Sequence, residues 1–176
     1  MLQQSFLAKL LTAIAAVLAL VFLSFAGAFC QDMREGEARS HNQQGMEYFK
    51  RGFYDHAPRN QVADAERNYR LAVKELKTAI SKDFSYTEAH RNLARVYFVQ
   101  KNFDGAAEEY KRVAELAPGD LDAYVNRALA LIELGRPGEA IQVLENAKGH
   151  TRDPKALETL DSYMGKIRAC QEVEVR

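Results

Sequence analysis

The chain has 176 residues, with 24 basic and 24 acidic side chains and an apolar fraction of 47%. Zero net charge disfavours a general nucleic-acid binder, which needs a basic excess to displace the counterions around phosphates. The apolar fraction excludes a chain that is disordered throughout, and two cysteines are too few for a disulfide framework. The charges are unevenly distributed, because Lys9 is the only charged residue among residues 1–30.

The N-terminal segment has the pattern of a targeting or anchoring element. Leu10–Phe29 is a continuous apolar run in which only two side chains are polar, and Lys9 precedes it. A positive start followed by an apolar stretch and small residues is typical of a secretory signal peptide. Ala26-Gly27-Ala28 supplies the small-x-small pattern, so residues 1–28 are predicted as a signal peptide that is cleaved after Ala28.

Two alternatives to cleavage remain open at this segment. Twenty helical residues rise about 30 Å and can cross a bilayer, so residues 10–29 could stay as a membrane anchor. Cys30 could instead carry a lipid, although Phe29 stands where such a site has a small residue. All three interpretations place the charged body outside the cytoplasm, either released into a periplasm or held at the inner membrane.

The charged body contains an internal repeat. Apolar residues recur at one constant offset in three sets of positions: Ala72, Ala106 and Ala140; Leu76, Tyr110 and Leu144; Ala79, Val113 and Ala147. Spacings of three and four residues within each repeat are helical periodicity. Glycine-containing segments at 102–105 and 135–138 interrupt the helices at matching places, so each unit is predicted as helix, turn, helix. Pro118 ends the second helix of its unit.

At these residues the sequence resembles the tetratricopeptide repeat, a family of 34-residue helix-turn-helix units. The unit 87–120 carries the family pattern through Leu93, Ala94, Tyr97, Ala106, Tyr110 and Pro118. The unit 121–154 carries it through Tyr124, Ala128, Leu131, Ala140, Leu144 and Ala147, and has Arg127 where a leucine is usual. The resemblance implies an all-α superhelix of about three units, and the N-terminal segment suggests an exported, bacterial-type member.

The first unit, about residues 39–86, is longer than the family pattern. Gly45 and Ala72 lie 27 residues apart, whereas the corresponding Ala94 and Ala106 lie 12 apart. An insertion of 15 residues, roughly 55–69, accounts for the difference. The apolar spacing predicts one long helix over residues 61–82 with Asn60 as its N-cap, preceded by a loop at 55–59.

Two flanking segments complete the predicted organisation. Residues 29–38 are expected to form a flexible lead. Residues 155–171 place Leu157, Leu160, Met164 and Ile167 on one helical face. This segment resembles the helix that caps such arrays, whose ends need a polar outer face. The predicted repeat domain therefore covers residues 39–171.

The sequence shows no motif of an enzyme or of a metal or cofactor site. It has no glycine-rich phosphate loop, no paired metal-binding histidines and no Cys-x-x-Cys. His90 occupies a large-residue position where packing explains it, and Glu108 and Glu109 diverge on a solvated helix face. We therefore predict no catalytic residue, no cofactor and no metal. Cys30 and Cys170 could pair in an oxidising compartment, although an extended array would hold them far apart.

Proteins of this family generally hold ligands in the concave groove made by the first helices of the units, and the resemblance implies the same surface here. The predicted groove residues are Asn42, Met46, Arg91, Asn92, Arg95, Phe98, Asn126 and Leu129. The amides would bond a partner's backbone, the guanidiniums an acidic group and the apolar groups its side chains. The alternative is that the asparagines and the apolar residues pack between units.

Some members of the family clamp the terminal carboxylate of a partner with lysines and asparagines in this groove. Asn92 and Asn126 stand where such an asparagine occurs, but the lysines are missing, and Arg91 and Arg95 replace them only in part. The sequence therefore predicts a non-enzymatic adaptor that binds a peptide or helix of another protein outside the cytoplasm. The alternative is a membrane-anchored or self-associating structural scaffold that uses the long inserted helix.

Overall fold

The chain divides into two compact units, Met1–Glu37 and Ala38–Arg176. The computed structural model describes residues 25, 27 and 29–174. The predicted signal peptide, its cleavage after Ala28 and the alternative membrane anchor therefore lie outside the described residues. Within the part that is described, no helix combines the length and the apolar character needed to cross a membrane.

The described residues 29–37 of the first compact unit are helical, where a flexible lead was expected. Gln31 donates a hydrogen bond of 3.1 Å to Glu35 one turn further on. Cys30 and Cys170 are both exposed, and their pairing stays a prediction because they belong to different compact units.

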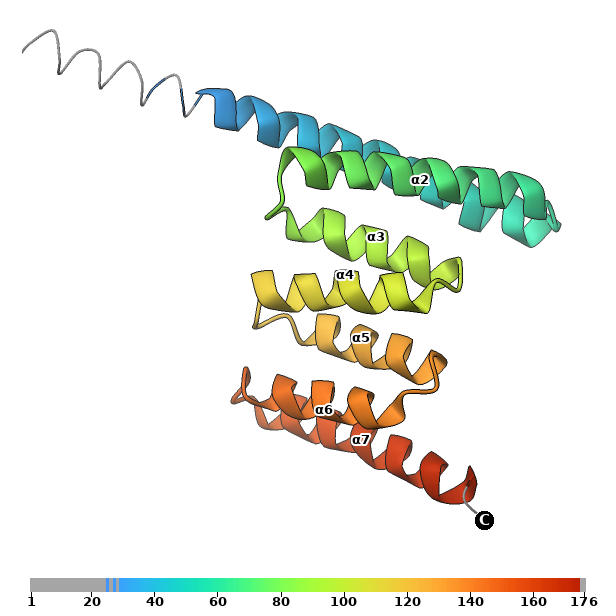
Figure 1. Cartoon of the computed structure of the whole chain (residues 1–176), viewed down its shortest axis with the longest axis vertical. Helices are drawn as coiled ribbons and strands as arrows, with labels where there is room; N and C mark the ends of the chain where they lie inside the picture. Colours follow the sequence, from blue (N-terminus) through green and yellow to red (C-terminus); the bar gives the residue numbers. More distant parts are fainter. Residues whose placement is uncertain (1–24, 26, 28, 175–176) are drawn as a thin grey trace, which may run out of the picture. The chain divides into compact units, whose positions relative to one another are not determined.

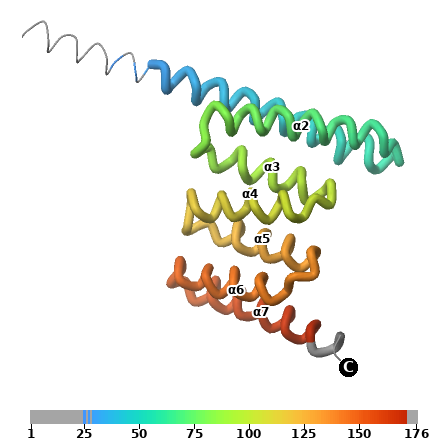
Figure 2. The backbone as a smooth tube through the Cα atoms, in the orientation of Figure 1, coloured from blue at the N-terminus to red at the C-terminus, as the bar shows by residue number. Residues whose placement is uncertain are grey.

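The second compact unit is all-α, with no strand among its described residues. Helical residues 38–50 come first. The elements that follow are η1 (Arg51–His56), η2 (Ala57–Arg59), α2 (Val62–Lys82), α3 (Thr87–Val99), α4 (Phe103–Leu116), α5 (Leu121–Glu133), α6 (Pro137–Lys148) and α7 (Pro154–Glu174). From α2 onward each helix packs against the next one in the sequence (Figures 1 and 2). Contacts between sequence neighbours are the mark of a repeat architecture.

The turns between the two helices of a repeat use the same backbone conformation at equivalent positions. Lys101 and Gly135 both have a left-handed backbone, with φ of 59° and 70°. Glycine adopts this conformation without a steric penalty, whereas lysine does so at a cost. After the first of these turns, Asn102 caps α4 by accepting a hydrogen bond from the Gly105 amide, whereas α6 begins at Pro137 without a side-chain cap. In the turn between the repeats, Asp120 caps α5 by accepting a hydrogen bond from the Ala123 amide.

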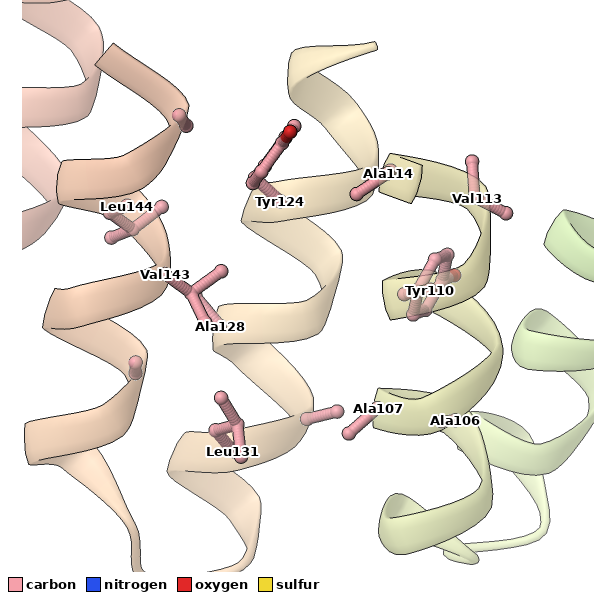
Figure 3. Packing of buried hydrophobic residues seen from close by; sticks show 14 of the residues in the cluster. Ala106, Ala107, Tyr110, Val113, Ala114, Tyr124, Ala128, Leu131, Val143 and Leu144 are labelled. Atoms are coloured by element: carbon pink, nitrogen blue, oxygen red, sulfur yellow. The ribbon is translucent and has the colours of Figure 1, made fainter. Parts of the chain in front are cut away.

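Small residues allow the paired helices to approach closely. Ala94 of α3 and Ala106 of α4 are fully buried, as is Ala140 of α6, while Ala128 of α5 is 2% exposed. The larger side chains of α4, α5 and α6 point into the spaces between these helices (Figure 3). The alternation of small and large residues therefore lets neighbouring repeats interdigitate at close-packed density.

The inserted segment does not form the predicted loop. The first helix continues into a π-helix, η1, and a short 3-10 helix, η2, before α2 begins at Val62. Asn60 does not cap α2 but adopts a left-handed conformation with φ of 58°. Aromatic packing explains the difference, because Phe49 stacks on Phe53 of η1 and contacts Tyr69 of α2. These contacts extend the helix pair through most of the insertion.

The last helix, α7, covers the exposed end of the array. Leu160 and Met164 are 2% exposed and Ile167 is 9% exposed, and all three join the core shared by α4, α5 and α6. The rest of the described helix surface is mainly polar. This pattern fits a terminal element that buries one face and presents the other to water.

Candidate functional site

The inner face of the repeat domain holds an open cavity of about 750 Å³. Its walls come mainly from the first helices of the repeats, with η1 at one end and the middle of α5 at the other. The residues that line it are Phe49, Phe53, Tyr54, Arg91, Arg95, Phe98, Val99, Tyr110, Asp120, Asp122, Asn126 and Leu129. Five of the eight predicted groove residues belong to this set: Arg91, Arg95, Phe98, Asn126 and Leu129.

The other polar pair of predicted groove residues is buried between helices. Asn42 is 3% exposed and Asn92 is 5% exposed. The Asn92 amide donates a hydrogen bond of 3.0 Å to Asn42, and the Asn42 amide donates one of 3.3 Å to the Tyr86 hydroxyl. Met46 is half-buried against the neighbouring apolar cluster. These three predicted residues therefore hold the first helix against α3 and do not line the cavity.

The two arginines of α3 differ in what they contact. The Arg91 guanidinium makes an ion pair with Asp120, the residue that also caps α5. Arg95 makes no hydrogen bond or ion pair within the part of the chain that the structure describes, and its side chain is exposed. Arg91 therefore has a structural role between repeats, and Arg95 is the arginine whose donors remain available to a ligand.

Asn126 and Leu129 stand on the opposite wall, on α5. The Asn126 amide donates a hydrogen bond of 2.8 Å to the backbone oxygen of Asp122 on its own helix, which leaves its side-chain carbonyl available. Leu129 is a large apolar residue with 41% of its surface exposed. Across the cavity, Phe98 packs edge to face on Phe103. The site therefore combines apolar surface with separate donors and acceptors.

Element η1, which leads into the insertion, supplies an aromatic wall that the sequence did not predict as part of the groove. Phe53 and Tyr54 of η1 pack edge to face with ring centroids 5.0 Å apart, and their exposed fractions are 40% and 66%. The spacing of Phe49 and Phe53 is helical and indicates that the helical face continues beyond Lys50. The loop predicted immediately after Tyr54 ended that helical face too early to include it in the groove. A π-helix at this place is a local irregularity of the kind that often accompanies functional sites.

The charges of the cavity are balanced, with two arginines and two aspartates among the lining residues. Tyr110 of α4 forms part of the floor. Burial raises the pKa of the Tyr110 phenol, while the nearby positive charges of Arg95 and Arg91 oppose that rise. The phenol therefore stays neutral at physiological pH, and the cavity presents no strong field of either sign.

The remaining titratable groups form no reactive constellation among the described residues. His90 is 6% exposed, and its two ring nitrogens face a Glu109 oxygen at 2.7 Å and the Phe84 carbonyl oxygen at 3.2 Å. Glu109 is therefore a partner of His90 and not simply part of a solvated face. The described part of the chain contains no group of three or more side chains suited to holding a metal ion.

Comparison with known sequence families agrees with this geometry. A family profile of the tetratricopeptide repeat matches residues 61–120, and a second profile of the same repeat matches residues 100–161. Together the two matches cover more than half of the chain. The chain belongs to the tetratricopeptide-repeat family.

Tetratricopeptide-repeat proteins of animals are among its relatives. Human RNA polymerase II-associated protein 3 is 27% identical in an alignment of 138 residues that covers 65% of this chain and 21% of the human protein. The rat protein is 25% identical over 134 residues. The chain thus spans about a fifth of the length of these relatives. They do not bear on the expected bacterial-type export, which stays a prediction.

Solved structures share the fold at low sequence identity. The first repeat domain of Spaghetti (RPAP3), bound to the HSP90 peptide SRMEEVD, is 19% identical with a TM-score of 0.57 and covers 78% of this chain and 95% of its own. The TPR2B domain of yeast Sti1, in a complex with pHsp70, is 20% identical with a TM-score of 0.56 and covers 78% and 98%. At this level the similarity shows the tetratricopeptide-repeat fold.

Proposed function

We propose that this chain is a non-enzymatic adaptor that binds a segment of a partner protein in the cavity between η1, α3 and α5. The observation that carries the proposal is the set of side chains around that cavity whose charge, apolar surface or carbonyl group remains available to a ligand. Arg95 has no ion-pair partner among the described residues, Phe53 and Leu129 expose apolar surface, and Asn126 has an available carbonyl group. Such a mixture suits an extended or helical segment that offers both side chains and backbone.

Solved relatives support a peptide as the ligand, because the Spaghetti domain holds the HSP90 peptide SRMEEVD. That peptide carries three acidic residues. In this chain Asp120 neutralises Arg91, and Asp122 adds a second negative charge to the cavity. We therefore propose a partner segment that offers apolar side chains and charges of both signs here, in place of a strongly acidic terminus.

Capture experiments with matched charge reversals test the proposal. The full chain carrying Arg95→Glu is compared with wild type and with Arg70→Glu, an exposed arginine of α2 that does not line the cavity. Reversing a charge that contacts the partner should reduce capture about tenfold or more. Quantitative mass spectrometry should show this loss for Arg95→Glu and none for Arg70→Glu. Equal capture by all three proteins would refute the proposal.

The site of action is a further part of the proposal. The apolar segment Leu10–Phe29 and the Ala26-Gly27-Ala28 pattern support export, with the repeat domain outside the cytoplasm. The mass of the exported protein distinguishes cleavage after Ala28 from a retained anchor.

The alternative function, a self-associating scaffold, is tested by deleting residues 55–69 and measuring the oligomer mass by light scattering. The scaffold requires that this deletion reduce the oligomer mass.

A further inference from the structure

A second cavity, of about 400 Å³, lies at the C-terminal end of the repeats. It is enclosed by α5, the start of α6 and α7, which are neighbours in the stack (Figure 1). Its main walls are Leu129, Ile132, Pro137, Tyr163 and Ile167. Its volume falls within the range of about 300–1,000 Å³ that is usual for ligand pockets. We call it the α5–α7 pocket.

The walls of the α5–α7 pocket remain partly uncovered. Leu129 is 41% exposed, Ile132 is 36% exposed and Tyr163 is 38% exposed. A soluble surface seldom gathers large apolar side chains around one depression unless something binds there. An apolar side chain of a ligand would complete this cluster.

One charged side chain, Lys166, is found among the described residues that line the pocket. Its ammonium group lies 5.9 Å from the centre of the Tyr163 ring, so it is held at the rim by a cation–π contact. Lys166 has no ion pair with any acidic side chain in the described part of the chain. The pocket therefore offers an apolar interior and an available positive charge beside it.

The α5–α7 pocket adjoins the groove described above. Leu129 of α5 lines both cavities. A segment that lies along the groove past Asn126 and Leu129 would reach the α5–α7 pocket. The charge of the surface changes along this path, from balanced charges near Asp120 and Arg91 to a single positive charge at Lys166.

We propose that the α5–α7 pocket anchors one large aliphatic or aromatic side chain of the partner segment, and that Lys166 pairs with an acidic residue close to that anchor. The inference rests on the proposed function and specifies the chemistry of its ligand. Apolar burial supplies the anchor, and the ammonium group fixes the direction in which the segment runs.

Selection from a random peptide library displayed on phage tests this inference. The baits are the full chain as wild type, as Lys166→Glu and as Lys155→Glu, an exposed lysine of the same helix outside the pocket. Wild type and Lys155→Glu should enrich peptides with a large apolar residue near an acidic one. Lys166→Glu should enrich a basic residue at the acidic position and bind the wild-type peptides about tenfold more weakly.

The possible outcomes separate the inference from the function on which it rests. If the enriched peptides bind Lys166→Glu and Ile132→Asp as tightly as wild type, the proposed role of the α5–α7 pocket is refuted, while peptide binding in the groove still holds. Absence of any enriched peptide on a folded wild-type chain would count against both. Light scattering that shows a dimer dissociated by Ile132→Asp would also overturn the inference, because the pocket would then be an interface between copies. Circular dichroism verifies that each variant is folded.

Discussion

Replacing Asn92 with alanine should destabilise the repeat domain much more than the same replacement at Asn126, which occupies the equivalent position of the next repeat. The Asn92 amide donates a hydrogen bond of 3.0 Å to Asn42, and both residues are buried. Truncation leaves the Asn42 acceptor buried without a partner, which costs about 1–3 kcal/mol. Asn126 is half-buried and bonds only to its own helix, so its loss should cost about 0.5 kcal/mol or less.

Urea unfolding followed by circular dichroism measures these free energies. A double-mutant cycle with Asn42→Ala and Asn92→Ala isolates the interaction between the two amides, and we expect a coupling of about 1 kcal/mol or more. Each kcal/mol should also lower the melting temperature by about 2–4 °C for a domain of this size. Equal destabilisation by Asn92→Ala and Asn126→Ala, or a coupling near zero, would refute the structural role of the pair.

Three further predictions concern packing, an unsatisfied group and pH. A Cβ at Gly45 would lie 2.8 Å from Leu76, so Gly45→Ala should destabilise the fold by about 1–3 kcal/mol. A Cβ at Gly165 in α7 would meet no atom within 4 Å apart from the neighbouring backbone of its own helix, so Gly165→Ala should stabilise the fold by about 0.5–1 kcal/mol in the same urea assay. The Arg127 Nε is buried without a hydrogen-bond partner among the described residues. Arg127→Leu should therefore raise the free energy of unfolding by about 1 kcal/mol, and a melting temperature below that of wild type would contradict this prediction. Burial raises the pKa of Tyr110 in the folded state. The stability that its neutral phenol contributes is therefore present below the unfolded pKa of about 10 and is lost as pH rises above that value. At alkaline pH the urea midpoint of wild type should consequently fall more steeply than that of Tyr110→Phe.

The helical repeat could be predicted from the sequence because its determinants are local and periodic. Small residues recur at fixed spacings, and they are buried where the two helices of a repeat pack closely: Ala94, Ala106, Ala128 and Ala140. The turns are equally local, since Gly135 stands at a position whose backbone is left-handed, a conformation that glycine adopts readily. These features need no knowledge of distant contacts.

The candidate site could be predicted only in part, because polar side chains acquire their roles from distant partners. Asn92 and Asn126 stand at equivalent positions, yet Asn92 meets Asn42 across a helix interface, 50 residues away in the sequence, while Asn126 faces the cavity. The ion pair between Arg91 and Asp120 is a second contact of this kind. Nothing in the periodic pattern distinguishes these cases, since a partner that lies far away in the sequence decides each one.

The long helix predicted over residues 61–82 agrees with α2, but the loop predicted at 55–59 was wrong for a related reason. A Pro58-containing stretch favours a loop by local preference. Phe49 instead packs on Phe53 and on Tyr69, which keeps the segment helical and brings Phe53 and Tyr54 to the groove. Tertiary contacts thus override local propensity here.

Photo-crosslinking from Phe98 tests the central claim, that the groove is the surface that binds a partner. Phe98 lines the cavity, and Phe84 is an equally aromatic control that is 69% exposed and lies outside it. Each residue is replaced in the full chain by a benzophenone-bearing phenylalanine, and the products are identified after irradiation in cells. The account predicts that position 98 captures a discrete partner and that position 84 does not. Capture of the same partner from position 84 alone would contradict it.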